Sequence, residues 1–126
     1  MITFDGIKRI RSIGGGCLKA IWEDAESDTG VDSYNVYIRN GIADVFHPEY
    51  LWANVRNDIT SAILRTEADR DIFLRNHYCY YVGVNAVEIG GDISPDVYIA
   101  YVKNMSVYGD GSEAVEIPDR KIAKVL

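Results

Sequence analysis

The sequence is poor in the residues that stabilise or equip small domains by special means. Its 126 residues include two cysteines, two histidines and three prolines. Two cysteines are too few for a disulfide-rich scaffold, and two histidines without His-x-x-His or Glu-x-x-His spacing form no recognisable zinc site. A single domain of this length buries an ordinary core without either kind of cross-link.

Long apolar runs are also missing. No window approaches the roughly 18 apolar residues of a membrane-spanning helix. Residues 1–11 mix charges into short apolar pairs, so no signal-peptide core is visible. If the chain is a whole gene product, we expect it to be kept in a cytoplasm, or built into a particle assembled there; a trimmed piece of a secreted protein is the alternative. No membrane partner is expected.

Positive charge is scarce. The 13 Lys and Arg residues are outnumbered by 19 Asp and Glu residues, which gives a formal net charge of −6. An acidic domain repels the phosphate backbone, so nucleic acid is not an expected partner. One short basic cluster, Lys8, Arg9 and Arg11, fits a solvated strand edge better than a phosphate or lipid site.

What the sequence does contain is a period-two alternation of apolar and polar residues between turn residues, which is typical of half-buried strands. It predicts strands over residues 2–10, 17–22, 34–39, 58–65, 78–87 and 97–102. Gly14-Gly15-Gly16 and Asn40-Gly41 mark turns, and residues 43–46 fit a short returning hairpin arm. Residues 49–56 fit one helical turn or an irregular loop, and residues 66–74 fit a helical turn or a short loop.

Short strands separated by turn signals predict an all-β fold, an antiparallel sandwich of about seven strands. We expect the sandwich to occupy residues 1–103, with an insertion at 41–58. Residues 104–126 are expected to form a C-terminal arm or an extra strand.

Three strand motifs agree in order and spacing with one family. They are Leu18, Ala20 and Trp22, then Tyr34, Val36 and Ile38, and then Leu74 followed six residues later by Tyr80, Val82, Val84 and Ala86. In these motifs the chain, from about Phe4 to Val102, resembles the fibronectin type III family. It departs from that family at Asn76-His77, where Pro-Gly is usual, in the length of residues 41–58, and in the residues beyond Lys103.

The resemblance implies an immunoglobulin-like sandwich with a tyrosine corner. The Tyr80 ring would pack in the core while its hydroxyl ties down the preceding crossover, and Leu74 would close the bottom of the same core. The core residues expected on this basis are Leu18, Trp22, Tyr34, Val36, Leu74, Tyr80, Val82 and Val84.

Cys17 and Cys79 fall on the second and sixth expected strands, which immunoglobulin domains join by a disulfide. Both alternate out of step with Trp22 and Tyr80, so both should point outward, from different sheets. That placement is incompatible with the Cα separation of about 5.5 Å that a disulfide requires. We expect two thiols, in keeping with a reducing compartment.

Five acidic residues gather in one loop, and calcium prefers converging oxygen ligands. They are Glu23, Asp24, Glu26, Asp28 and Asp32. Thr29 stands where an EF-hand loop needs glycine, so a solvated loop is expected, and Asp24, Glu26 and Asp28 are only a weak candidate for a cation. His47 and His77 are expected in loops, and no nucleophile with an ordered base is apparent. Neither a cofactor nor an enzymatic activity is expected.

Candidate interface residues fall in three places. Tyr50, Leu51 and Trp52 lie in the insertion, where they would anchor a partner or cap an open end of the sandwich. Tyr37, Tyr81, Tyr98 and Tyr101 would line an outer sheet face. The arm after Lys103 would add a strand to a neighbour or stay without fixed structure.

These features favour a non-catalytic structural or interaction module. Sandwiches of the resembled family recur as decorations of bacteriophage tails and capsids, so a subunit of a phage tail or virion is expected, with protein partners and self-association. The alternative is recognition of a surface glycan or receptor, with Trp52 and Tyr50 stacking on a sugar. Both are hypotheses, because one fold hosts many functions.

Overall fold

The computed structural model describes residues 2–14, 17–40, 45–65, 80–91, 93–94 and 98–102, and of residues 12–14, 40 and 98–102 it describes the backbone alone. The strands within these residues are β1 (Ile2–Thr3), β2 (Ile7–Gly14), β3 (Cys17–Trp22), β4 (Glu26–Ser27), β5 (Val31–Asn40), β6 (Leu51–Arg56), β7 (Ser61–Arg65), β8 (Tyr80–Glu88) and β9 (Tyr98–Val102). One short 3-10 helix, η1 (Pro48–Tyr50), precedes β6.

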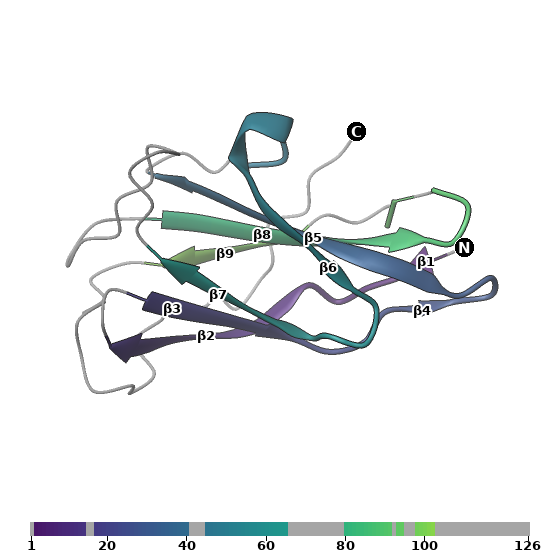
Figure 1. Ribbon diagram of the computed structural model, residues 1–126, viewed down its shortest axis with the longest axis horizontal. Helices are drawn as coiled ribbons and strands as arrows, with labels where there is room; N and C mark the ends of the chain where they lie inside the picture. Colours follow the sequence, from purple (N-terminus) through teal and green to yellow (C-terminus); the bar gives the residue numbers. More distant parts are fainter. Residues whose placement is uncertain are drawn as a thin grey trace.

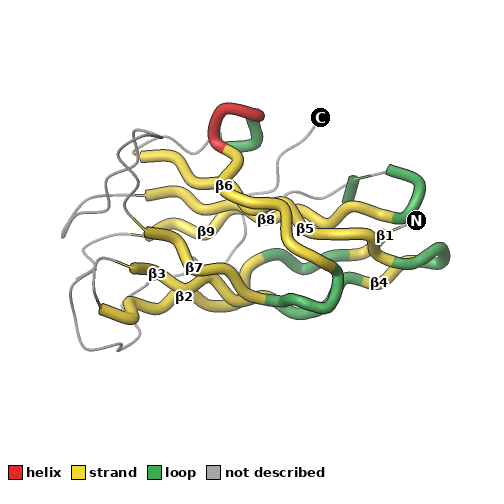
Figure 2. The backbone as a smooth tube through the Cα atoms, in the orientation of Figure 1, coloured by secondary structure: helices red, strands yellow, loops and turns green. Residues whose placement is uncertain are grey.

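The strands form two antiparallel layers (Figure 1). One sheet has the order β2-β3-β7 and the other the order β6-β5-β8-β9, while β1 and β4 make a small separate pair. Figure 2 shows one layer lying over the other, with both running along the long axis of the molecule. The prediction of an all-β antiparallel sandwich is therefore confirmed.

The core lies between the two sheets and follows the period-two alternation. On β3, Leu18, Ala20 and Trp22 are buried while the residues between them are half-buried. The other expected core residues within the described part are also buried: Tyr34, Val36, Tyr80, Val82 and Val84. Leu74 lies outside the described residues.

Gly6 divides the first predicted strand into two. Its φ of 77° lies in the left-handed region that glycine enters without steric cost. The chain consequently leaves β1, which pairs with β4, and enters β2, which pairs with β3. Phe4 is buried in the core between them.

Part of the segment 41–58, which was expected as an insertion, forms a strand. Residues 51–56 form β6, which pairs with β5, so the prediction of a helical turn or irregular loop is wrong beyond Tyr50. Residues 45 and 46 are not a strand, so the predicted hairpin arm is wrong for them. The pairing of β5 with β6 shifts register between Val36 and Tyr37. This irregularity interrupts the period-two pattern of β6, so the sequence pattern does not indicate a strand there.

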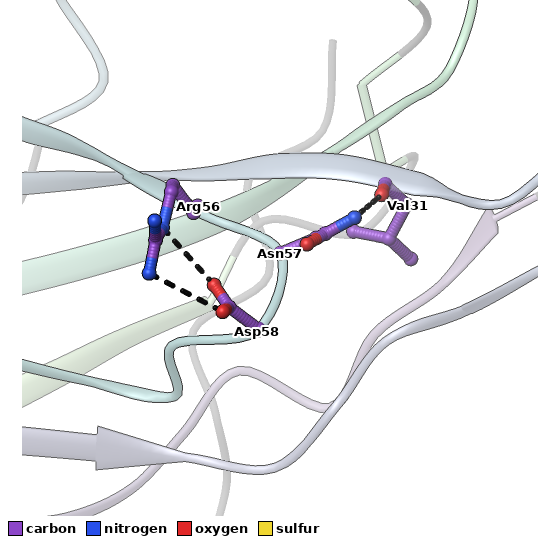
Figure 3. Close-up of polar contacts among 4 residues, drawn as sticks. All are labelled: Val31, Arg56, Asn57 and Asp58. Atoms are coloured by element: carbon purple, nitrogen blue, oxygen red, sulfur yellow. Dashed lines mark hydrogen bonds and ion pairs between the residues drawn. The ribbon is translucent and has the colours of Figure 1, made fainter.

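The turn after β6 is fixed by side chains (Figure 3). Asn57 Nδ2 donates to the Val31 carbonyl oxygen at 2.9 Å, and Arg56 contacts Asp58 with Nε 3.2 Å from Oδ1. The turn is thereby tied to the start of β5. The predicted turn at 66–74 and the C-terminal arm at 104–126 lie outside the described residues.

Candidate interaction surface

The outer surface of the four-stranded sheet carries a cluster of half-exposed aromatic side chains. Tyr37 and Arg39 project from β5, and Arg39 pairs in register with Tyr81 on β8. Phe46 and Tyr50 come from the connection between β5 and β6. We call this set, Tyr37, Arg39, Phe46, Tyr50 and Tyr81, the aromatic face.

The connection is held against the sheet at Gly83. Val45 is fully buried although it lies outside the main core cluster. A Cβ atom on Gly83 would lie 2.5 Å from Phe46 Cζ and 2.7 Å from Val45 Cγ2, well inside van der Waals contact. Only glycine therefore lets Val45 and Phe46 pack directly on the backbone of β8.

Ring contacts organise the rest of the aromatic face. The Tyr37 and Phe46 rings meet edge to face with centroids 5.1 Å apart, a preferred aromatic geometry. Arg39 Cζ lies 4.4 Å from the centre of the Tyr50 ring, a cation–π contact. His47 meets the same ring at 6.1 Å, and its carbonyl accepts from the Tyr50 N–H at 3.0 Å. These contacts hold the half-exposed rings in fixed positions.

A row of asparagines continues the same surface. Asn35 pairs in register with Asn54 on β6 and with Asn85 on β8. Asn54 Nδ2 donates to Asn35 Oδ1 at 2.9 Å and to Ser33 Oγ at 3.0 Å. Asn85 is buried, and its Oδ1 has no hydrogen-bond partner among the described residues, an energetically unfavourable state for an amide oxygen.

The predicted interface residues of the insertion are separated by the fold. Tyr50 is half-exposed in η1 and belongs to the aromatic face. Leu51 pairs with Tyr37 on the neighbouring strand. Trp52 packs against the core cluster instead.

Tyr98 and Tyr101 were expected to share an outer face with Tyr37 and Tyr81. Their backbone registers differ: Tyr101 pairs with Tyr81, whereas Tyr98 pairs with the core residue Val84. Two positions three residues apart in a strand fall on opposite sides of its alternation. Register therefore places the Tyr101 backbone beside Tyr81 and the Tyr98 backbone beside Val84.

The sequence did not reveal the structural role of the Tyr34 hydroxyl. Tyr34 is fully buried between Phe4 and Trp22, with ring centroids 5.5 Å from each. The hydroxyl accepts a hydrogen bond from the Ala25 N–H at 2.9 Å, which ties residues 23–32, called here the acidic loop, to the core. Burial raises the pKa of Tyr34 above its usual 10.0, the Ala25 bond opposes that rise, and the Asp24 carboxylate adds to it.

A buried carboxylate anchors the other end of that loop. Glu88 at the end of β8 is buried and accepts a hydrogen bond from Ser27 Oγ. The Thr29 N–H donates to the same Ser27 oxygen at 3.2 Å, and the Ile89 N–H donates to the Gly30 carbonyl at 2.9 Å. These bonds join β4 to the end of β8, so we read Glu88 as structural.

The remaining candidate residues, those for a metal site, a thiol or a histidine site, do not form a common site within the described part of the chain. Among the described residues, no three His, Cys, Asp or Glu side chains gather as a metal site would require, and Asp24, Glu26 and Asp28 are each exposed. Cys17 is half-buried on β3, out of step with Trp22 as expected. Cys79 and His77 lie outside the described residues, while His47 lies in the connection beside Tyr50. No helix in the described part is long and apolar enough to span a membrane.

Comparisons with known proteins show similarity of fold alone. No protein-family model matches the chain, and no curated protein sequence matches it. Among solved structures, it is similar to the spore cortex lytic enzyme SleM of Clostridium perfringens, with a TM-score of 0.57 and 15% identity over 78% of this chain and 27% of that chain. It is also similar to a myokine, with a TM-score of 0.51 and 22% identity over 78% of this chain and 90% of that chain. The chain thus spans about a quarter of the enzyme's length, and both likenesses are of fold alone.

Proposed function

We propose that this chain is a fibronectin type III-like module that acts without catalysis, as an interaction subunit of a larger assembly. Its longer strands divide into sheets of three and four, the division of a seven-stranded immunoglobulin-like sandwich. The likeness to a segment of about a quarter of a larger enzyme supports a module that works attached to, or docked on, other proteins.

The observation that carries the proposal is the aromatic face. Tyrosine, phenylalanine and arginine are enriched at protein interfaces and dominate binding hot spots. Here the Tyr37–Phe46 and Arg39–Tyr50 contacts already fix the rings, so binding costs little side-chain entropy. A protein surface is thus the partner we propose for this face. The setting in a phage tail or virion stays a prediction.

The test expresses the tagged native chain and two surface variants in the native host and compares the size at which each fractionates. The native chain is expected to fractionate with a larger assembly, and the double variant Arg39→Ala/Tyr50→Ala is expected to fractionate as a smaller species. Ile89→Ala, which trims a side chain that is 54% exposed elsewhere, is the matched control and should behave as native. Unchanged fractionation of the double variant would contradict a role for the aromatic face.

A second candidate is recognition of a glycan, favoured by the row of asparagines beside Tyr37. Amides both donate and accept hydrogen bonds, as sugar hydroxyls require, and Asn54 is exposed. Trp52, the stacking residue first expected for this role, packs on the core instead. A glycan array probed with the native chain and with Asn54→Ala tests this candidate, and the absence of any Asn54-dependent signal would exclude it.

A further inference from the structure

Asn85 holds an unmatched hydrogen-bond acceptor beside the aromatic face. Its side chain is 4% exposed, and its Oδ1 has no hydrogen-bond partner among the described residues. Asn85 alternates with the core residues Val84 and Ala86, so it belongs to the outer side of the four-stranded sheet. Buried amide oxygens are nearly always paired, because an unmatched one costs free energy. Local rules of this kind are broken mainly at functional sites, which makes this oxygen a candidate for contact with a ligand.

Asn85 is the inner end of a row of asparagines. Asn35 on β5 pairs in register with Asn85 on one side and with Asn54 of β6 on the other. Side chains directly opposite each other in an antiparallel sheet have Cβ atoms about 4.5–5.5 Å apart, so the amides are neighbours. Exposure falls along the row, from exposed Asn54 through half-buried Asn35 to buried Asn85. The row, Asn35, Asn54 and Asn85, is thus accessible from the edge strand β6 and deepest at β8. We call it the asparagine row.

Hydrogen bonds orient the amides of the asparagine row. Asn54 Nδ2 donates to Asn35 Oδ1 at 2.9 Å and to Ser33 Oγ at 3.0 Å. The Asn35 oxygen is therefore engaged, and the nitrogen is the part of the Asn35 amide that donates to a ligand. The neighbouring Asn85 oxygen accepts, and the two groups do not bond to each other. Together they offer one donor and one acceptor side by side.

The side of Asn85 that faces Gly83 is apolar. Gly83 lies two residues earlier on β8, and so on the same side of the sheet, where Val45 and Phe46 cover it. Tyr37 pairs in register with Gly83. A hydrogen bond beside such side chains is shielded from water and is electrostatically stronger for it. A charged group would lose its hydration there, so a neutral group that both donates and accepts fits best.

We propose that Asn35 and Asn85 bind a primary carboxamide, the side chain of an asparagine or glutamine of the protein partner. The oxygen of the bound carboxamide accepts from Asn35 Nδ2, and its nitrogen donates to Asn85 Oδ1. Its hydrocarbon stem lies toward Val45 and Phe46. The site adjoins the aromatic face through Tyr37. This inference rests on the proposed function, for which it names a chemical group that the partner presents.

A sugar hydroxyl is the competing donor for the same oxygen. A hydroxyl also donates and accepts, but a sugar carries it on a broad ring, whereas Asn85 lies at the deepest end of the asparagine row. A carboxamide on a slender stem reaches that end from the β6 side. A carboxylate only accepts, so it would set one of its oxygens against the Asn85 oxygen. These differences define the three probes of the test.

The test is an NMR titration of the isotope-labelled full chain, followed through the side-chain amide signals of the asparagine row. Propionamide represents the partner's side chain, propionate is the control that only accepts, and methyl glucoside represents a glycan. Propionamide is expected to shift the Asn35 and Asn85 signals with a Kd of about 0.1 M or lower, as for a ligand of about five non-hydrogen atoms. Propionate should bind about tenfold more weakly or less, because it leaves the Asn85 oxygen unmatched.

Two variants alter the site with little change of shape. Asn35→Asp keeps the acceptor for Asn54 and removes the donor, whereas Asn85→Leu keeps a branched side chain and removes the acceptor. Each should weaken propionamide binding about tenfold or more. Asn57→Asp is the matched control, because Asn57 is an exposed asparagine outside the row, in the turn after β6, where its Nδ2 donates to Val31. It should bind propionamide as the native chain does.

Urea unfolding separates a binding role of Asn85 from a structural one. In the binding role, Asn85→Leu removes an unmatched buried oxygen, so the urea midpoint should stay the same or rise. In a structural role, the midpoint should fall while the folded variant binds propionamide as before, which would contradict the proposal. Asn35→Asp decides the matter where Asn85→Leu does not fold, because Asn35 is half-exposed and its substitution leaves the Asn54 bond in place.

Three results would overturn the inference: no saturable shift of the asparagine row up to about 0.5 M propionamide, equal binding of propionate, or unchanged binding by Asn35→Asp. Tighter binding of methyl glucoside at the row would assign it to the glycan candidate. Arg39→Ala/Tyr50→Ala should retain the propionamide site, so a failure here leaves the aromatic face untouched. Conversely, native propionamide binding together with an Arg39→Ala/Tyr50→Ala variant that fractionates as the native chain does would reject the proposed function and keep the carboxamide site.

Discussion

At the scale of single residues, the Tyr34 hydroxyl connects the acidic loop to the core. Tyr34→Phe removes the acceptor of the Ala25 N–H and leaves that buried group unsatisfied. We expect the free energy of unfolding to fall by about 1–3 kcal/mol at neutral pH. Equilibrium urea unfolding measures this loss. Tyr37→Phe, at a half-exposed position of the outer surface, is the control and should lose less.

The same side chain predicts a pH dependence. Because burial raises the pKa of folded Tyr34 above 10.0, the unfolded chain releases this proton first as pH rises. The Tyr34 contribution is therefore complete below about pH 10 and is lost as the pH rises through the folded pKa. Urea unfolding between neutral pH and about pH 11 should show a shallower loss for Tyr34→Phe than for the native chain. Equal slopes would contradict the shift.

Gly83 is the residue on which the aromatic face depends. Gly83→Ala places a methyl group 2.5 Å from Phe46 Cζ, and such overpacking costs about 1–3 kcal/mol. Phe46→Ala should recover part of that cost in the double variant, because the contact with Val45 Cγ2 at 2.7 Å remains; a double-mutant cycle of urea unfolding measures the recovery. Gly91→Ala is the comparison, since its φ of 98° strains alanine but nothing lies within 4 Å of the Cβ position. Phe46→Ala should not rescue it.

At the scale of elements, the sequence predicted those strands whose alternation is regular and whose inner side is fully buried. β3 and β8 are of this kind, with Leu18 and Val82 marking their core sides. β6 is an edge strand with a register shift, and its Trp52 is only partly buried. Its sequence pattern therefore resembles that of a loop. The role of Gly83 was equally hidden, because contact with Phe46 depends on tertiary packing that no local pattern records.

The position of β6 predicts that two nearby aromatic residues, Trp52 and Tyr50, contribute differently to stability. Trp52→Ala should destabilise the fold by about 1–3 kcal/mol, because a partly buried apolar side chain leaves the core. Tyr50→Ala should cost less than about 1 kcal/mol, the range of an exposed cation–π contact. Urea unfolding of both variants checks the order, and a larger loss for Tyr50→Ala would contradict the packing of Trp52.

At the scale of the whole molecule, the excess of negative charge links stability to salt. The formal net charge is −6, and five exposed carboxylates lie together in residues 23–32, so salt should screen their repulsion and raise the free energy of unfolding. Urea unfolding at low and high salt measures this effect, and a fall in stability with salt would contradict it.

The two tryptophans turn the sandwich into its own optical reporter. Trp22 is buried in the three-stranded sheet, with its ring centroid 5.5 Å from that of Tyr34, while Trp52 is half-exposed on the edge of the other sheet. Their emission should differ in colour, and replacing either by phenylalanine would leave a probe of one sheet. Comparing the two single-tryptophan chains during unfolding shows whether the sheets separate together or one before the other.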